Sequence, residues 1–227
     1  MLLFPYVAPS ITKTSRTAAA TTLENGAEQT LSSCSITVAK KSKAITKISL
    51  YNGSTLLDSK EGDAVANGGT FTFNGFDAIT VNKSNNPNLK FVVDDESKAS
   101  AATANVGAST FVYPYYWGVC AKGATIDEAL VEGLTKSIQS KANSQAVTYD
   151  CDNQCMVFAY PHDTTISGLN YGNLVSILDP NNFETIGGYT KHIVSITGLD
   201  GKAVSYNVYV SGAGSATGFK VTYKLVK

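Results

Sequence analysis

Apolar and polar residues alternate along much of this chain, and turn-forming pairs interrupt the alternation at short intervals. In residues 31–38, Cys34, Ile36 and Val38 lie on one side of an extended backbone, and serine or threonine occupies positions 33, 35 and 37. A period of two is typical of a β-strand with one buried face. Asn52-Gly53 separates two such runs and predicts a hairpin, because both residue types accept positive φ. The pattern therefore favours folds built on sheets.

Residues 23–113 carry short predicted strands at a spacing of about 8–12 residues. About seven strands in about 90 residues is the size of an immunoglobulin-like β-sandwich, and we expect that fold here. The sandwich would lack the antibody disulfide, because Cys34 has no second cysteine in this half. Residues 1–22 are expected to form an N-terminal arm. Its first part, residues 1–9, is expected to be a free arm or an edge strand that docks either on a partner or on its own domain.

Residues 114–227 predict a small α+β module with one main helix packed on an antiparallel sheet. Thr125 and Glu128 have the spacing of a capping box at the start of that helix. Apolar residues then recur at intervals of four, which places them on one helix face: Ile126, Leu130, Leu134 and Ile138. Strands are predicted at residues 147–149, 154–160, 189–196, 204–210 and 219–226. The loop after Pro161 is long, and one helical turn is expected at 173–178.

The charge pattern argues against a nucleic-acid partner. The chain has 18 basic and 18 acidic residues, and Arg16 is its only arginine. Nucleic-acid binding usually requires a basic surface in which arginine reads phosphates and bases. No apolar run approaches the roughly 18–20 residues that span a bilayer, so we expect no membrane partner. The first residues lack the basic region of a signal peptide, and we expect synthesis in a cytoplasm.

An aromatic cluster marks the border between the two predicted domains. Tyr115, Tyr116 and Trp117 follow a proline and precede a glycine, and Tyr160 ends a later strand. One interpretation is a packed joint between domains. The other is an exposed aromatic patch that binds sugar or peptide, for which these four residues are the candidate binding residues.

Residues that could carry catalysis or bind metal are few. His162 and Asp163 are adjacent, but no nucleophile motif accompanies them, so we predict no catalytic residue, no cofactor and no enzymatic activity. Cys120, Cys151, Cys155 and His162 are weak candidates for a zinc site, and free thiols are the alternative. The acidic run at residues 94–96 is expected to be a solvated turn, with weak calcium binding as the alternative.

The second half contains a series of short motifs in a fixed order. The aromatic-glycine joint is followed by the acidic helix pattern, by Tyr160-Pro161, by the run at 174–184, and by the strand pair at 206–210 and 219–223. This order resembles the C-terminal module repeated in virion proteins of tailed bacteriophages, including crAss-like phages, where it commonly follows Ig-like strands. The resemblance covers roughly residues 105–227. Trp117 and the pair Cys151 and Cys155 depart from the family pattern.

The resemblance implies a structural virion component of the neck, tail or fibre-attachment region. Such a protein would be made in the bacterial host cytoplasm and would act through contacts with other virion proteins. It would be present in several copies or as a homo-oligomer. The alternative function is a carbohydrate- or receptor-binding module that uses the aromatic cluster near residues 113–117.

Overall fold

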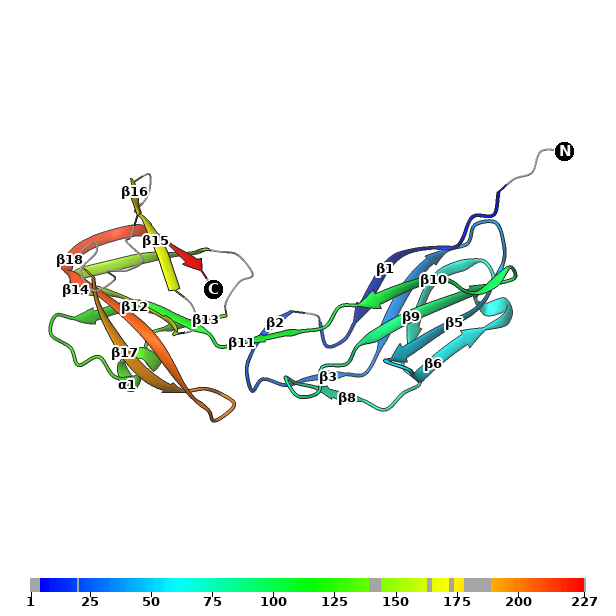
Figure 1. Cartoon of the computed structure of the whole chain (residues 1–227), viewed down its shortest axis with the longest axis horizontal. Helices are drawn as coiled ribbons and strands as arrows, with labels where there is room; N and C mark the ends of the chain where they lie inside the picture. Colours follow the sequence, from blue (N-terminus) through cyan, green and yellow to red (C-terminus); the bar gives the residue numbers. More distant parts are fainter. Residues whose placement is uncertain are drawn as a thin grey trace. The chain divides into compact units, whose positions relative to one another are not determined.

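The structure is a computed structural model of residues 1–227, and it describes residues 5–19, 21–138, 144–162, 165–171, 174–177 and 189–226. The described part of the chain is mainly β, with 64% strand and 4% helix, which confirms the prediction of a mainly β protein (Figure 1). The chain divides into two compact units. Unit 1 is Met1–Leu23 with Ala27–Phe111, and unit 2 is Glu24–Gly26 with Val112–Lys227.

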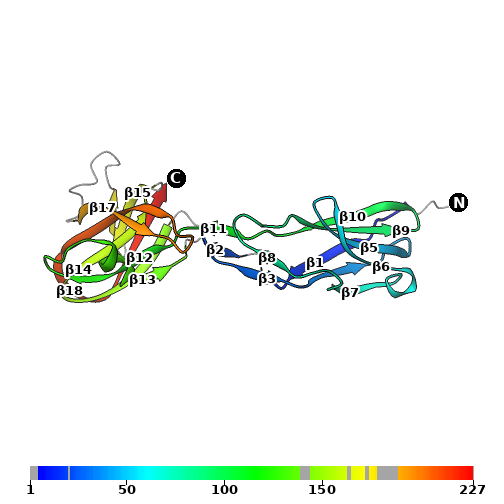
Figure 2. The same ribbon diagram turned by 90° about the horizontal axis from the view of Figure 1, so that it is seen from below.

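Unit 1 is built on two antiparallel sheets, which Figure 2 shows as separate layers. The three-stranded sheet has the order β1-β4-β7 and the four-stranded sheet has the order β10-β9-β5-β6, and a small sheet pairs β3 with β8. The strands of the first sheet are β1 (Ser10–Arg16), β4 (Cys34–Ala39) and β7 (Gly68–Phe73). Those of the second are β5 (Ile45–Asn52), β6 (Thr55–Glu61), β9 (Leu89–Asp95) and β10 (Lys98–Val106). The remaining elements are β3 (Gln29–Leu31), the 3-10 turn η1 (Gly62–Ala64) and β8 (Ile79–Val81).

Buried side chains alternate with more exposed ones along these segments, which is the pattern that favours a strand. Along β4 and β9 every second side chain is buried, and the buried residues of both sheets form one hydrophobic core. Phe73 and Phe91 meet edge-to-face across this core, with ring centroids 5.2 Å apart. The hairpin predicted at Asn52-Gly53 is confirmed, because Asn52 pairs with Thr55 and Gly53 has φ 59° in the turn.

The N-terminal segment is more than an arm. Residues 10–16, which the sequence assigned to it, form β1 and pair with β4, and Ala18 is buried in the unit 1 core. The strand was missed because its residues are mostly serine, threonine and lysine, without a clear apolar period. Tyr6 and Val7 contact their own unit: the Tyr6 hydroxyl donates to Asp95 over 2.5 Å, and the Val7 amide donates to the Ser42 hydroxyl over 2.8 Å.

Unit 2 is built on a seven-stranded antiparallel sheet. Its order is β13-β12-β14-β18-β15-β16, and β17 also pairs with β18. The two longest strands run side by side in Figure 1, β14 (Ser144–Pro161) and β18 (Ala203–Val226). The shorter strands are β12 (Tyr115–Ala121), β13 (Thr135–Ser137), β15 (Thr165–Tyr171), β16 (Leu174–Ile177) and β17 (Tyr189–Thr197). A separate two-stranded sheet pairs β2 (Thr22–Glu24) with β11 (Thr110–Val112).

The predicted main helix is wrong in length and in its start. Helix α1 covers only Glu128–Glu132, and its N-cap is Asp127, whose carboxylate accepts the Leu130 amide over 2.9 Å. Gly133 caps the helix at its other end. The residues that follow, Thr135–Ser137, form the edge strand β13 instead, because they pair with β12. One short helix therefore replaces the helix expected over residues 126–138.

The helical turn expected at residues 173–178 is also wrong where the structure describes it. Residues 174–177 form β16 and pair with β15. The rest of the predicted turn and the remainder of the long loop after His162 lie largely outside the described residues. No helix in the described part of the chain has the length and apolar character needed to cross a bilayer.

The sheet of unit 2 carries one hydrophobic cluster on each face. The first is rich in aromatic rings: Tyr115, Val147, Tyr149, Phe158, Tyr160, Tyr189, Tyr209, Val221 and Tyr223. Its centre is the stack of Phe158 on Tyr223, with centroids 3.7 Å apart. The second cluster combines Val131 of α1 with side chains of the strands: Tyr116, Cys120, Cys155, Val157, Ala159, Val194, Ile196, Tyr206 and Val208. We call these the aromatic cluster and the helix-side cluster.

Glu24–Gly26 belongs to unit 2 because its contacts are made there. The Glu24 carboxylate lies 2.6 Å from the Lys136 ammonium, and the Glu24 side chain is only 11% exposed. Gly26 has φ +96°, and a Cβ at this position would lie 2.4 Å from the Asp200 amide nitrogen. Only glycine combines this conformation with so close an approach of another backbone.

We predict that Gly26→Ala destabilises unit 2 more than Gly201→Ala does. Gly201 also has positive φ, at +72°, but a Cβ there meets nothing within 4 Å. The control therefore reports the conformational cost alone, about 1–2 kcal/mol, whereas Gly26→Ala adds an overpacking cost of about 1–3 kcal/mol. Chemical denaturation followed by tyrosine fluorescence measures both. Equal losses for the two variants would contradict the close packing at Gly26.

Candidate functional site

The aromatic residues of the predicted binding patch are part of the core of unit 2. Tyr115, Tyr116 and Tyr160 are 7%, 5% and 2% exposed. Because neighbouring side chains of a strand point to opposite faces, β12 places Tyr115 in the aromatic cluster and Tyr116 in the helix-side cluster. An exposed patch formed by these rings is therefore wrong. They are packed, as the other interpretation held, but within unit 2.

Ring contacts fix each of these side chains in place. Tyr115 stacks on Tyr160 with centroids 6.0 Å apart, and Trp117 meets Tyr149 edge-to-face at 5.8 Å. Tyr116 meets Tyr206 at 5.6 Å. Burial, together with the smaller effect of nearby glutamate charges, raises the pKa of Tyr116 to about 12. Trp117 is half-buried and is the one member of the predicted set with substantial exposure.

His162 lies at the end of β14 in a shallow pocket of about 350 Å³. Its Nδ1 atom is 2.7 Å from the Asn207 side-chain oxygen, so the partner that orients the ring is an amide and not a carboxylate. Tyr113, Lys202 and Ser205 also line the pocket. Asp163, the predicted orienting group, lies outside the described residues.

The four candidate zinc ligands do not converge. His162 lines the pocket just described, whereas Cys120 and Cys155 line a different pocket, of about 380 Å³, together with His192. Cys151 lines a third pocket, of about 250 Å³. Among the described residues, no three histidine, cysteine or carboxylate side chains are grouped so that they could hold a metal ion.

Sequence reasoning missed the approach of Cys120 to Cys155. The two residues lie 35 positions apart in sequence, and β12 and β14 place them directly opposite each other. Both thiols are free and buried. Burial raises the pKa of Cys120, and the neighbouring Cys155 raises it further. Only the register of the two strands reveals this pair, and a single sequence does not specify that register.

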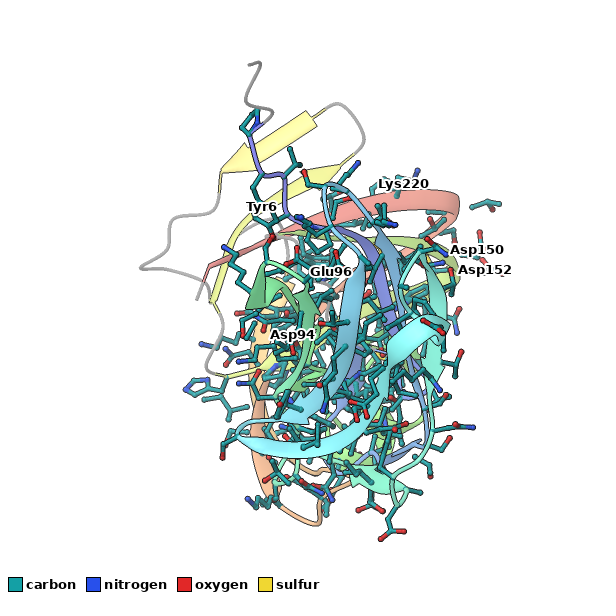
Figure 3. The ribbon with its side chains drawn as sticks, turned by 90° about the vertical axis from the view of Figure 1, so that its right-hand side faces the viewer. Tyr6, Asp94, Glu96, Asp150, Asp152 and Lys220 are labelled. Carbon is teal, nitrogen blue, oxygen red and sulfur yellow. The ribbon has the colours of Figure 1, made fainter. Side chains whose placement is uncertain are left out.

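The acidic run at residues 94–96 organises a turn of unit 1 and is not simply solvated. Asp95 is 5% exposed, and its carboxylate accepts hydrogen bonds from Tyr6 and from the amides of Ser97 and Lys98. Asp94 accepts the Ser100 amide over 2.5 Å. Figure 3 labels Asp94 and Tyr6 at this end of unit 1. The carboxylates of Asp94 and Asp95 therefore already have protein donors.

A second group of carboxylates lies where β14 is irregular. Asp150 accepts the Gly218 amide over 2.7 Å, and Asp152 accepts the Ser215 hydroxyl over 3.0 Å. Both residues are labelled in Figure 3. These bonds join β14 to β18 at the point where the register of the two strands shifts, next to Cys151. Their role is to hold the two long strands together across an interrupted ladder.

Comparison of the chain with protein-family models, curated proteins and solved structures gave no significant match. Three features of the two units bear on function: the aromatic rings are internal, the carboxylates of the acidic run accept hydrogen bonds within the fold, and the thiol pair lines a pocket.

We predict that acid destabilises unit 1 through Asp95. Burial raises the pKa of this carboxyl, but the hydrogen bonds from Tyr6, Ser97 and Lys98 and the Lys98 charge outweigh it, so the folded pKa lies below its usual value. The stabilisation is therefore complete above the unfolded pKa of about 3.9 and is lost as the pH falls through the lower folded value. Thermal melts from pH 7 down to pH 2 measure the loss.

Tyr6→Phe removes one of the donors to Asp95 and keeps the ring. It should raise the folded Asp95 pKa towards its unfolded value, so the variant should be less stable than the parent protein at neutral pH and should lose less stability on acidification. Tyr51→Phe is a suitable control, because Tyr51 lies in β5 and has no part in this turn. An acid transition that is unchanged in Tyr6→Phe would contradict the assigned role of Tyr6.

Proposed function

We propose that the chain is a structural component of a tailed-phage virion and acts through contacts with other virion proteins. The order of motifs in residues 105–227 suggests this function, and the architecture supports it. Both units are small sheet-based bodies whose cores are filled by their own side chains. What they offer to a partner is their outer surface and the open edges of their sheets.

We infer that unit 1 is an Ig-like sandwich. The three-plus-four arrangement of its two sheets, with one shared core, is the pattern of such domains. Cys34 is buried without a disulfide partner, and burial raises its pKa to about 11. In place of a disulfide, the contact of Phe73 with Phe91 links the two layers. Many cell-surface domains share this sandwich architecture.

The observation that carries the proposal is the edge strand β17. In the described part of the chain it pairs only with β18, so the backbone groups of its other side have no strand partner. Glu128 accepts the Thr197 amide over 2.6 Å and covers one end of the edge. Ile193, near the middle of the strand, is 64% exposed, and Leu199 in the following turn is 60% exposed. Apolar side chains beside an open edge suit strand addition by a partner.

The alternative of a glycan-binding module has less support. Sugar-binding sites use the exposed faces of aromatic rings, and three of the four predicted rings are buried. Of these four residues, Trp117 alone retains partial exposure, and its ring packs edge-to-face against Tyr149. We therefore propose no carbohydrate site on these residues.

The proposal is tested by quantitative mass spectrometry of purified particles from the phage that encodes the chain. We expect a fixed ratio of this protein to the major capsid protein in every preparation, because an assembled component has a set copy number. The protein present in the infected lysate but missing from the particles would refute a virion role.

A variant pair tests the β17 edge. Ile193→Lys should reduce incorporation into particles several-fold, because a charge replaces an exposed apolar contact at the interface. Leu56→Lys makes the same chemical change at a residue of β6 that is 47% exposed, and it should incorporate normally. Circular dichroism and thermal melts of both purified variants check that folding is unaffected. Equal incorporation of both variants and the parent would exclude β17 as the contact.

A further inference from the structure

The pair Cys120 and Cys155 has the placement that a disulfide requires. Directly opposite residues of antiparallel strands have Cα atoms about 4.5–5.5 Å apart and side chains on the same face. Disulfides are found at Cα separations of about 4.4–6.8 Å. Cys120 and Cys155 are such partners, and both belong to the helix-side cluster. Bond formation would therefore need only side-chain rotation.

The pair is also accessible to small reagents. Cys120 and Cys155 are 5% and 6% exposed, which is too little for contact with a macromolecule. However, both line the pocket of about 380 Å³, together with Ile126, Val210 and His192. A compact molecule that enters this pocket reaches both sulfur atoms. Buried thiols without such access would be inert.

We propose that Cys120 and Cys155 form a dithiol site that small organic disulfides oxidise to a cross-strand disulfide. The thiolate of one cysteine attacks a sulfur of the reagent, forms a mixed disulfide and releases one thiolate of the reagent. The second cysteine then attacks the protein sulfur of the mixed disulfide and releases the other half of the reagent as a thiol. In sum, two protein thiols and one disulfide give one protein disulfide and two reagent thiols.

Cys151 is excluded as the partner by its position. It is only four residues from Cys155, but it lines a separate pocket with Met156 and Phe219, residues that pack against the aromatic cluster. The irregular stretch between the two cysteines includes Asn153 at φ 51°. The two thiols of this short motif therefore line different pockets. The sequence-adjacent pair is the wrong pair, and the cross-strand pair is the reactive one.

The bond would link β12 to β14, the two strands between which α1 lies in the sequence. Residues 121–154 become a closed loop that includes α1 and β13. A disulfide stabilises mainly by restricting the unfolded chain, and the effect grows with loop length. The oxidised protein should therefore unfold at a higher temperature than the reduced protein. This inference is independent of the proposed virion function.

The test treats the folded, full-length protein with hydroxyethyl disulfide, followed by alkylation of the remaining thiols. We expect an intact mass about 2 Da lower before alkylation, corresponding to loss of two hydrogens, and two fewer alkylated sites. Cleavage after lysine should yield peptide 99–122 joined to peptide 142–191, since Cys120 lies in the first and Cys155 in the second. A link internal to peptide 142–191 would instead identify Cys151 with Cys155 and overturn the proposal.

The variants separate the remaining outcomes. Cys151→Ser should keep the cross-link between the two peptides, whereas Cys155→Ser should abolish it. The oxidised parent protein should melt several degrees higher than the reduced protein, and dithiothreitol should reverse the shift. Stable mixed disulfides without the cross-link, or thiols that react only after denaturation, would refute the proposal. The cross-link and the melting shift are both measured on the parent protein, so the test stands even if a variant fails to fold.

Discussion

The pairing of β14 with β18 is the interaction on which unit 2 depends. These strands have 18 and 24 residues, and every other strand of the sheet except β13 and β16 attaches directly to one of them. β12 lies along β14, while β15 and β17 lie along different stretches of β18. A slip by one residue in this ladder would move the side chains of the shifted strand to the opposite face of the sheet and so disrupt both clusters. The hydrogen bonds of Asp150 and Asp152 hold the register where the ladder is interrupted.

Burial of both sheet faces explains the unusual residues of these strands. Tyr206 and Val208 pack on the helix-side cluster, while Asn207 and Tyr209 lie on the opposite face, and all four are buried. A buried polar group needs a partner. The Tyr206 hydroxyl donates to the Pro114 carbonyl, and the Asn207 side chain contacts His162. The aromatic residues that suggest a binding surface in the sequence are thus required by a sheet that packs on two sides.

Much of the β architecture could be predicted, because alternation in a strand depends only on neighbouring residues. β4, β5, β9 and the hairpin after Asn52 follow from that pattern. The extent of helix α1 does not follow from the sequence pattern. The apolar spacing in residues 126–138 fits a longer helix, whereas the pairing of β13 with β12 decides the structure after Gly133. The candidate site was predicted least well. Exposure of the aromatic rings and the partner of Cys155 both depend on which strands meet, and this information is distributed over the whole chain.

The insertion of Glu24–Gly26 into unit 2 has a consequence for biosynthesis. A ribosome delivers these residues before residues 27–111 of unit 1, whereas Lys136 and the turn at Leu199 and Asp200 that receive them emerge far later. While the chain is nascent, the Glu24 carboxylate has no Lys136 to pair with and Gly26 has no backbone to pack against. Residues 27–111 can therefore begin to fold while the environment of this segment does not yet exist. Residues of unit 2 that are translated far later complete the surroundings of Glu24–Gly26.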